Sequence, residues 1–345
     1  MAEVVRRRRW TFRIGPICLA AIWFCALAAA EEGDPLPSWN EGEAKQAILK
    51  FVRATTDPES SEMVPADERI ATFDNDGTLW VEHPMYTQMM YCIDRLKSVV
   101  EQRPELKEKS GFKAVLSGDR EAIAHLGMDE MKEIFAVTLA GMTVDEFQAD
   151  AAHWLATAKS RRFDRLYTEL VYQPMLEVLA LFRAHGFKTY IVTGGGQDFV
   201  RVFAQRVYGI PPEQVIGTAG VTKYGYDKAG QPQLTKEPKL LFIDDQAGKP
   251  EGINLLIGRR PVAAFGNSIG DRQMLEYTTA GSGSRLGMLL LHDDAEREFA
   301  YGPAENLPAT RVGEFTQALH DEATMRSWTV IRMQRDWKTV FKFEK

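Results

Sequence analysis

Cysteine is scarce in this sequence of 345 residues, which has three. Cys18 and Cys25 lie in the first 30 residues, so a chain that loses this stretch keeps Cys92 alone and cannot form an internal disulfide. Cys92 is surrounded by apolar residues, which predicts a plain core position. Closely paired cysteines and a His-x-x-x-His spacing are absent, so nothing in the sequence indicates a zinc site.

The sequence also lacks a clear membrane span. The apolar run from Ile14 to Ala30 falls short of the roughly 20 residues that a span needs. It follows four arginines (residues 6–9) and ends in small residues before the acidic segment "EEGD", which predicts a secretory signal peptide over residues 1–30. We therefore expect a protein exported to the periplasm or beyond. An uncleaved membrane anchor is the alternative, and the route, Sec or twin-arginine, stays open.

An excess of basic charge is missing as well. The formal net charge is −6, from 42 Lys and Arg against 48 Asp and Glu. Cleavage near Ala30 removes five arginines and one glutamate, which leaves 37 against 47 and a net charge of −10. A processed chain with this net charge has no positive electrostatic field to attract nucleic acid or anionic lipid, so we expect neither as a partner after signal cleavage. The sequence does not indicate an oligomeric state.

The composition is that of a globular protein, 45% hydrophobic and 26% charged. Residues 31–65 are predicted to form a linker and one helix, "EAKQAILKFVRATT". Beyond them, strands such as "RIATF", "FKTYIVTGGG", "KLLFIDD", "PVAAFG" and "LGMLLLH" alternate with helices such as "DFVRVFAQRVYG" and "DRQMLEY". This order predicts an α/β, Rossmann-like parallel sheet with helices on both faces. Ligands of such sheets bind beyond the carboxyl ends of the strands.

The alternation stops between residues 81 and 172, where the pattern is entirely helical. We expect a helical insertion over the sheet, with residues 66–80 and 173–345 forming the core domain. One of its helices is predicted to begin at a capping box formed by Thr143 and Glu146. Residues 220–237, with "YDKAGQP" at their centre, are predicted to form a β-hairpin.

The segment "FDNDGT" places Asp74 and Asp76 directly after a predicted buried strand. Alternation along the chain directs both carboxylates the same way, and two adjacent anions are unfavourable unless a cation or a shared proton compensates them. A calcium loop of the EF-hand type is excluded, because its sixth and twelfth positions hold Leu79 and Met85 instead of glycine and glutamate. A solvated turn is the plain alternative.

Three further segments place polar residues at strand ends or helix starts. Thr193 ends a strand and precedes Gly194 and two more glycines, whose N–H groups suit an anion. Lys249 stands at a helix start, where a lone lysine is usually just solvated. Asn267 ends another strand, and Asp271 opens a helix four residues later, the usual place of an N-cap.

Other polar stretches near the C-terminus have weaker interpretations. The segment "GSGSRLG" imitates a dinucleotide fingerprint, but it precedes a strand, so we expect a loop. His292, Asp293 and Asp294 follow a strand; they either border the site or, the stronger expectation, begin a helix with acidic first-turn residues.

The order D-x-D-G-T, T-G-G-G, Lys and G-N-S-x-G-D resembles the haloacid dehalogenase (HAD) superfamily, and within it the phosphatase branch that includes phosphoserine phosphatase. The resemblance runs from about Ile70 to Leu291 and rests on the four-part order. The helical insertion after the first motif is similar to the cap of that branch. The resemblance implies a phosphoric monoester hydrolase that uses Mg²⁺ and acts on a small phosphorylated substrate.

The resemblance also implies roles for single residues. Asp74 matches the nucleophile that becomes an aspartyl-phosphate, and Asp76 matches the general acid and base. Thr193 and Lys249 match the donors that hold the phosphoryl oxygens, next to Gly194. Magnesium is assigned to the Asp74 side chain, the Asp76 backbone carbonyl and an acidic residue of the last motif.

The last motif departs from the family pattern. Many members carry aspartate where this sequence has Asn267, and asparagine where it has Gly270. Asp271 is therefore the preferred acidic ligand of the metal, with Asn267 as a direct or water-mediated partner. The number of direct protein ligands stays open.

The substrate is less well specified. In phosphoserine phosphatase-like members a glutamate soon after the first motif recognises the substrate amine; Glu82 lies near that place, but His83 holds the matching register. We also expect pocket-lining roles for Trp80, Met85, Tyr86, Met89 and Arg120, or else packing between cap and sheet.

Three functions are compared. A carbon–halogen hydrolase of the same superfamily needs no acid at the second position, so Asp76 argues against it. Nothing in the sequence favours a non-catalytic exported binding protein. An exported phosphatase that scavenges phosphate from diverse small esters is the preferred hypothesis.

Overall fold

The structure is a computed structural model that describes residues 33–118, 122–123 and 126–344. The predicted signal peptide, residues 1–30, lies outside these residues, as does Arg120. Residues from Pro35 onward form one compact unit. Within the described residues no helix is long and apolar enough to cross a membrane.

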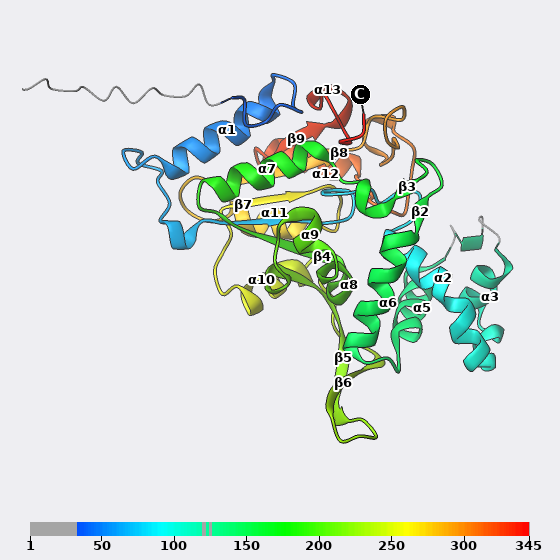
Figure 1. Ribbon diagram of the computed structural model, residues 1–345. Helices are drawn as coiled ribbons and strands as arrows, with labels where there is room; N and C mark the ends of the chain where they lie inside the picture. Colours follow the sequence, from blue (N-terminus) through cyan, green and yellow to red (C-terminus); the bar gives the residue numbers. More distant parts are fainter. Residues whose placement is uncertain (1–32, 119–121, 124–125, 345) are drawn as a thin grey trace, which may run out of the picture. The chain divides into compact units, whose positions relative to one another are not determined.

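A seven-stranded sheet forms the centre of this unit, in the order β6-β5-β4-β1-β7-β8-β9 (Figure 1). All neighbouring strands pair in parallel except β5 and β6. The mostly parallel α/β fold predicted from the alternation is therefore confirmed. Its strands are β1 (Ile70–Phe73), β4 (Lys188–Gly196), β5 (Val215–Tyr226), β6 (Pro232–Phe242), β7 (Ala263–Gly266), β8 (Leu286–Leu291) and β9 (Thr329–Arg332).

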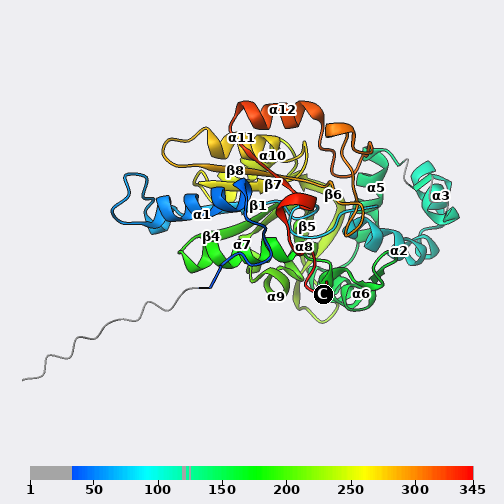
Figure 2. The same cartoon turned by 90° about the horizontal axis from the view of Figure 1, so that it is seen from above.

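Helices cover both faces of the sheet (Figure 2). Successive residues of a strand point to opposite faces, so Ile191 joins one hydrophobic cluster and Val192 the other. Residues of α1 and α7 belong to the first cluster, along with residues of the helices between β1 and α7 and after β4, and residues of α10, α11 and α12 belong to the second. These helices are α1 (Glu43–Thr56), α7 (Gln173–Ala184), α10 (Gly248–Leu256), α11 (Arg272–Thr279) and α12 (Gln317–Met325), with a short α13 (Met333–Asp336) at the end of the chain.

The helix α1 has the bounds expected from its apolar spacing. Its buried face includes Ile48, Phe51 and Val52, which belong to the same cluster as the sheet residues. The segment 31–65, expected to be a linker and a helix, thus contributes to the core packing. The strand β9, which extends the sheet beyond β8, was not predicted, because "TVIR" is short and only partly buried.

Two expected elements differ from the sequence prediction. "KLLFIDD" is not a separate parallel strand, because Leu240 and Phe242 belong to β6, which pairs antiparallel with β5. The hairpin predicted at 220–237 is therefore confirmed but longer at both ends. "DFVRVFAQRVYG" forms two short helices, α8 (Gln197–Arg201) and α9 (Ala204–Tyr208), instead of one.

The insertion between β1 and α7 is mainly helical, as expected. Its two ends run side by side, since Val81 N–H donates to Leu170 O and Tyr172 N–H donates to Leu79 O. Thr143 caps a helix through the predicted capping box, with Glu146 as its partner. The prediction of an entirely helical segment was wrong in one detail, a two-stranded β2–β3 ribbon. The elements are α2 (Thr87–Gln102), α3 (Ser110–Ser117), α5 (Met128–Leu139), α6 (Val144–Thr157), β2 (Lys159–Ser160) and β3 (Arg165–Leu166).

The insertion, which we call the cap, also pairs with the hairpin. Gly141 N–H donates to Lys236 O at 2.9 Å, and Lys236 N–H donates to Met142 O at 2.8 Å. The Lys236 ammonium pairs with Asp198 of the core and lies 4.8 Å from the centre of the Phe147 ring of α6. The cap is therefore joined to the core at the hairpin as well as at its own two ends.

Candidate active site

The polar residues singled out in the sequence converge at the carboxyl ends of the three central strands. Asp74 follows β1, Thr193 lies near the end of β4, and Asn267 follows β7. Asp74 and Thr193 border a cavity of about 380 Å³ between the sheet and the cap, within the usual range for small-molecule sites. Seven predicted site residues line it: Asp74, Asp76, Glu82, Thr193, Gly194, Lys249 and Asp271.

The "DNDGT" loop sends its two aspartates to the cavity and its asparagine into the protein. Asn75 is fully buried, accepts a hydrogen bond from Tyr208 Oη at 3.0 Å, and accepts three backbone N–H groups at its carbonyl. Gly77 has a φ of 75°, and a β-carbon there would lie 2.2 Å from Asn267 Nδ2 and 2.3 Å from Glu82 Oε1. Glycine is required here by both conformation and space.

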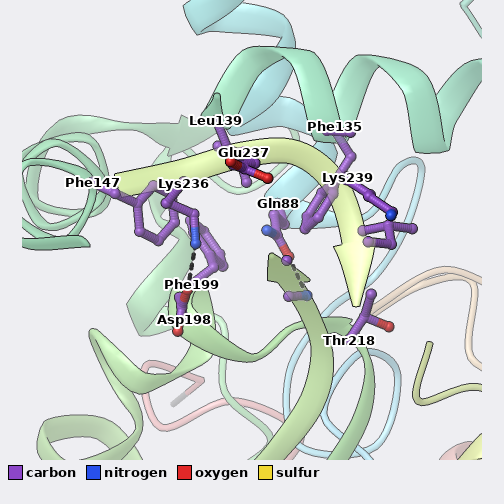
Figure 3. Close-up of a pocket in the computed structure, with 14 residues that line it drawn as sticks. Gln88, Phe135, Leu139, Phe147, Asp198, Phe199, Thr218, Lys236, Glu237 and Lys239 are labelled. Carbon is purple, nitrogen blue, oxygen red and sulfur yellow. Dashed lines mark hydrogen bonds and ion pairs between the residues drawn. The ribbon is translucent and has the colours of Figure 1, made fainter. Parts of the chain in front are cut away.

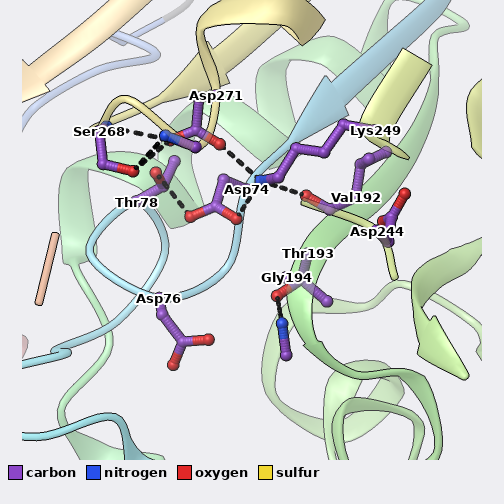
Figure 4. A network of polar contacts seen from close by, with 12 residues as sticks. Asp74, Asp76, Thr78, Val192, Thr193, Gly194, Asp244, Lys249, Ser268 and Asp271 are labelled. Atoms are coloured by element: carbon purple, nitrogen blue, oxygen red, sulfur yellow. Dashed lines mark hydrogen bonds and ion pairs between the residues drawn. The ribbon is translucent and has the colours of Figure 1, made fainter. Parts of the chain in front are cut away.

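Lys249 is the centre of a buried polar network (Figure 4). Its ammonium donates to Asp74 Oδ1 at 2.6 Å, to Asp271 Oδ1 at 2.5 Å and to Val192 O at 3.0 Å. These three acceptors match its three donors. Burial by itself would lower the pKa of Lys249, but Asp271 and Asp74 together raise it above its ordinary value, so the side chain is a cation.

Asp271 is held by the turn that precedes α11. Its Oδ2 accepts the N–H groups of Asn267 at 2.9 Å and Ser268 at 3.0 Å, while Oδ1 faces Lys249. Asp271 holds the N-cap position of α11, as expected, but its side chain makes no capping hydrogen bond to that helix and instead forms a buried ion pair with Lys249, with side-chain exposures of 1% for Asp271 and 2% for Lys249.

The glycine turn after β4 is more fully bonded than expected. Gly195 N–H donates to Thr193 Oγ1 at 3.0 Å, and Gly196 N–H donates to Gln88 Oε1 of the cap at 2.7 Å. Two of the three glycine N–H groups thus have protein acceptors, and α8 is only five residues long. The hydroxyl proton of Thr193 stays available for an acceptor in the cavity.

Asn267 and Glu82 form a second buried cluster beside the first. Asn267 Nδ2 donates to Glu82 Oε1 at 2.6 Å, and Asn267 Oδ1 accepts from Thr78 Oγ1 at 3.2 Å. Tyr301 Oη also donates to Glu82 Oε1, at 2.8 Å. Asn267 does not line the cavity, whereas Glu82 does. His83 stacks on Tyr301, with 3.6 Å between the ring centres, and does not line the cavity.

Burial changes the proton affinity of the acidic groups. It raises the pKa of Asp74 well above the ordinary value, and the nearby Asp271 raises it further against the opposing effect of Lys249. The pKa of Asp76 is also raised by burial, although the indole of Trp80 donates to its Oδ1 at 2.8 Å. This concentration of carboxylates would be relieved by a bound cation.

The donor set fits a hard cation such as Mg²⁺. The described residues contain no group of three or more His, Cys, Asp and Glu side chains arranged as a complete metal cage. Mg²⁺ commonly takes only one or two carboxylates and completes its shell with other oxygens. Asp74 and Asp271 can supply these two, since both are buried and both line the cavity.

His292 contacts the backbone of the aspartate loop, a role that sequence reasoning did not specify. Its Nε2 lies 2.7 Å from Gly77 O, and its Nδ1 lies 3.1 Å from Glu298 Oε2. The stronger expectation, that a helix begins here, was wrong, because no helix starts within residues 292–294. Asp294 pairs instead with Arg297, at 2.5 Å.

The cap contributes residues that the motifs did not indicate. Gln88, Met131, Lys132 and Phe135 line the cavity, and their helical spacing was the only signal in the sequence. Of the side chains considered earlier, Tyr86 and Met89 line it, whereas Trp80 and Met85 do not.

A second cavity, of about 20 Å³, lies where the cap packs against the hairpin, and Gln88 and Phe135 line both this cavity and the first (Figure 3). It has room for about one water molecule.

Solved structures that are similar to this chain are distant in sequence. A functionally unknown protein from Anaerococcus prevotii has a TM-score of 0.52 at 17% identity, covering 75% of this chain and 88% of that one. A protein of unknown function from Bordetella pertussis has a TM-score of 0.45 at 16% identity, covering 76% and 98%. A phosphoserine phosphohydrolase-like protein from Francisella tularensis has a TM-score of 0.37 at 17% identity, covering 65% and 88%.

Among curated proteins, none matches this sequence. The family model for haloacid dehalogenase-like hydrolases matches residues 71–276, which is more than half of the chain. This range begins just before the first aspartate motif and ends beyond Asp271, so it includes every residue of the buried network around Lys249. The chain therefore belongs to the family of haloacid dehalogenase-like hydrolases.

Proposed function

We propose that this hydrolase is a phosphatase, a Mg²⁺-dependent phosphomonoester hydrolase that works through an aspartyl-phosphate on Asp74. The observation that carries the proposal is the Lys249 ammonium, which lies 2.6 Å from Asp74 Oδ1 and 2.5 Å from Asp271 Oδ1 beside a substrate-sized cavity. It fixes the attacking carboxylate and supplies positive charge where phosphoryl oxygens would lie.

The cation would be held by the side chains of Asp74 and Asp271 and by the backbone carbonyl of Asp76. Asn267 would contact it through a water molecule. When bound, Mg²⁺ would neutralise part of the combined negative charge of the carboxylates and the phosphate. The negative lining of the cavity supports this requirement, because a phosphate dianion would otherwise meet the carboxylates of Asp74 and Asp271.

The first half of the reaction uses Asp74 and Asp76. A carboxylate oxygen of Asp74 forms the new bond to phosphorus while the bond from phosphorus to the ester oxygen breaks. Asp76 gives its proton to the departing alkoxide, and the raised pKa that burial gives this carboxyl suits a proton donor. The Thr193 hydroxyl donates to a phosphoryl oxygen, and the nearby charge of the Lys249 ammonium stabilises the phosphoryl oxygens as charge shifts among them.

The second half regenerates the enzyme. Asp76, now a carboxylate, takes a proton from a water molecule that attacks the phosphorus of the aspartyl-phosphate. The phosphorus–oxygen bond to Asp74 breaks and inorganic phosphate leaves. The indole N–H of Trp80 stays bonded to Asp76 Oδ1, which keeps the carboxyl in place through both proton transfers.

Export is a separate part of the proposal. Its support is the pattern of residues 1–30, a basic start, a short apolar run and small residues before an acidic segment. N-terminal sequencing of material recovered from outside the cytoplasm tests it. A mature chain that begins near residue 31 is expected, and intact Met1 in the membrane fraction would favour the anchor instead.

The activity is tested with a panel of phosphate monoesters, assayed with Mg²⁺ and with a chelator. We expect release of phosphate that needs the cation and that Asp74→Asn reduces by at least about a thousandfold. Release of chloride from chloroacetate under the same conditions tests the carbon–halogen alternative. Hydrolysis that survives chelation, or that persists in Asp74→Asn, contradicts the mechanism.

A further inference from the structure

We propose that the substrate is a phosphate monoester of an apolar, ring-sized alcohol that carries no second negative charge. This inference rests on the proposed phosphatase activity and deepens it. It comes from the part of the cavity that lies away from the catalytic carboxylates, where the cap and the hairpin supply the wall.

The cavity has two chemically different sides. Its floor is the buried network of Asp74, Lys249 and Asp271, and a phosphoryl group must reach this floor to react. The organic part of the ester then points away from the sheet. The apolar residues that meet it there are Tyr86 and Met89 near or on α2, Met131 and Phe135 of α5, and Leu240 and Ile243 of the hairpin and the segment after it.

These wall residues are suited to hold an apolar group of variable shape. Met89 and Met131 are buried, at 8% and 9% exposure, and methionine side chains adapt to different partners. Ile243 is 44% exposed, so it forms part of the entrance to the cavity. Covering these side chains with a ring removes apolar surface from water on both partners.

The charges of the wall disfavour a second anionic group. Among the described residues that line the cavity, Lys132 is the one basic side chain besides Lys249, and its ammonium lies 3.8 Å from Asp129 Oδ1 of its own helix. Asp245 has its pKa raised by burial, and the Lys132 charge acts in the opposite direction, so these two groups already interact. Lys249 is bonded to three acceptors of its own.

A carboxylate or a second phosphate on the organic group would therefore enter a low-dielectric space beside like charges, without a basic partner of its own. Esters of hydroxy acids and bisphosphates are expected to react poorly. An ester whose organic part is a neutral ring has no such cost and gains the apolar contacts.

Three esters of matched chemistry test the inference: ethyl phosphate, 2-phenylethyl phosphate and 2-(4-carboxyphenyl)ethyl phosphate. All three release a primary alcohol, so their intrinsic reactivity is similar. With Mg²⁺ present, kcat/KM for the phenyl ester should exceed that for the ethyl ester by roughly tenfold to a hundredfold, from burial of the ring. The carboxylate should lower it again by about tenfold or more.

Variants of the cavity entrance test the role of charge directly. Ile243→Lys should raise kcat/KM for the carboxylated ester at least about tenfold relative to ethyl phosphate, and Ile243→Glu should lower it. The matched control is Leu241→Lys. Leu241 is 72% exposed and is not part of the cavity lining, so its substitution adds the same charge nearby without changing the order of the esters.

The outcomes separate this inference from the proposed function. Hydrolysis that depends on Asp74 but shows no preference for the phenyl ester, or that favours the carboxylated one, overturns the substrate class and leaves the phosphatase activity standing. Equal responses of Ile243→Lys and Leu241→Lys also overturn it. Absence of hydrolysis of every ester in the wild-type protein overturns both.

Discussion

The floor and the wall of the cavity are built in opposite ways. On the floor, Asp74 and Lys249 are almost fully buried, come from the ends of core elements and have a protein partner for nearly every polar atom. On the wall, Met131 and Phe135 come from a cap helix and Ile243 from the loop after the hairpin, and they offer shape without directed bonds. Directed bonds fix chemistry, whereas apolar shape selects among substrates, so the two regions should respond differently to substitution.

The largest effect is expected from Lys249→Met, which removes the charge from the floor. The variant leaves Asp74 and Asp271 close together without the ammonium between them, so turnover of every ester should fall by at least about a thousandfold. Steady-state assays with the three matched esters check this. A loss that differs strongly between esters would contradict the division between floor and wall.

A smaller loss is expected from Gly77→Ala, which disturbs the geometry of the floor without changing its charge. The new β-carbon would lie 2.2 Å from Asn267 Nδ2 in a backbone with a φ of 75°, so we expect kcat to fall by about a hundredfold and the protein to lose about 2 kcal/mol of stability. Gly258→Ala is the matched control, with a φ of 72° and no atom within 4 Å. Similar activity of the two variants would show that backbone strain alone is responsible.

Gly196→Ala tests the boundary between the catalytic floor of the cavity and its apolar wall. A β-carbon there would lie 2.5 Å from Gln88 Nε2 and 2.8 Å from Phe135 Cζ, so it should push the cap away from β4. We expect KM for the phenyl ester to rise about tenfold, with a smaller change for ethyl phosphate. Gly220→Ala, whose nearest contact is 3.8 Å away, should leave both unchanged. An equal rise for both esters would place the effect on the floor instead.

The smallest effect concerns pH and the base of the cap. Burial lowers the pKa of His83 from 6.5 to about 4, so the unfolded chain binds this proton first as the pH falls. Stability should therefore decrease as the pH falls from 6.5 to about 4 and should be affected no further by His83 below that range. His83→Phe keeps a ring against Tyr301 and removes the titration. Melting temperatures measured between pH 7 and 4 should fall less steeply in this variant; parallel curves would contradict the assignment.

The sequence alone determined the parts that depend on local pattern. The period of apolar residues predicted the bounds of α1, and the position of Asp74 and Asp76 directly after a buried strand placed both at the carboxyl end of that strand. The four-part order of motifs, ending at Asp271, was enough to indicate the family, and three of its parts fall at the carboxyl ends of the parallel strands β1, β4 and β7.

Only the tertiary structure decided how these parts are bonded. That Lys249 lies between Asp74 and Asp271, that Asn267 faces Glu82, and that His292 reaches Gly77 are contacts between residues 22 to 215 positions apart. No local pattern encodes such contacts, because they follow from strand order and packing. The apolar wall is of the same kind. Phe135 and Ile243 look like ordinary helix and strand residues, and they form one surface only where the cap meets the hairpin.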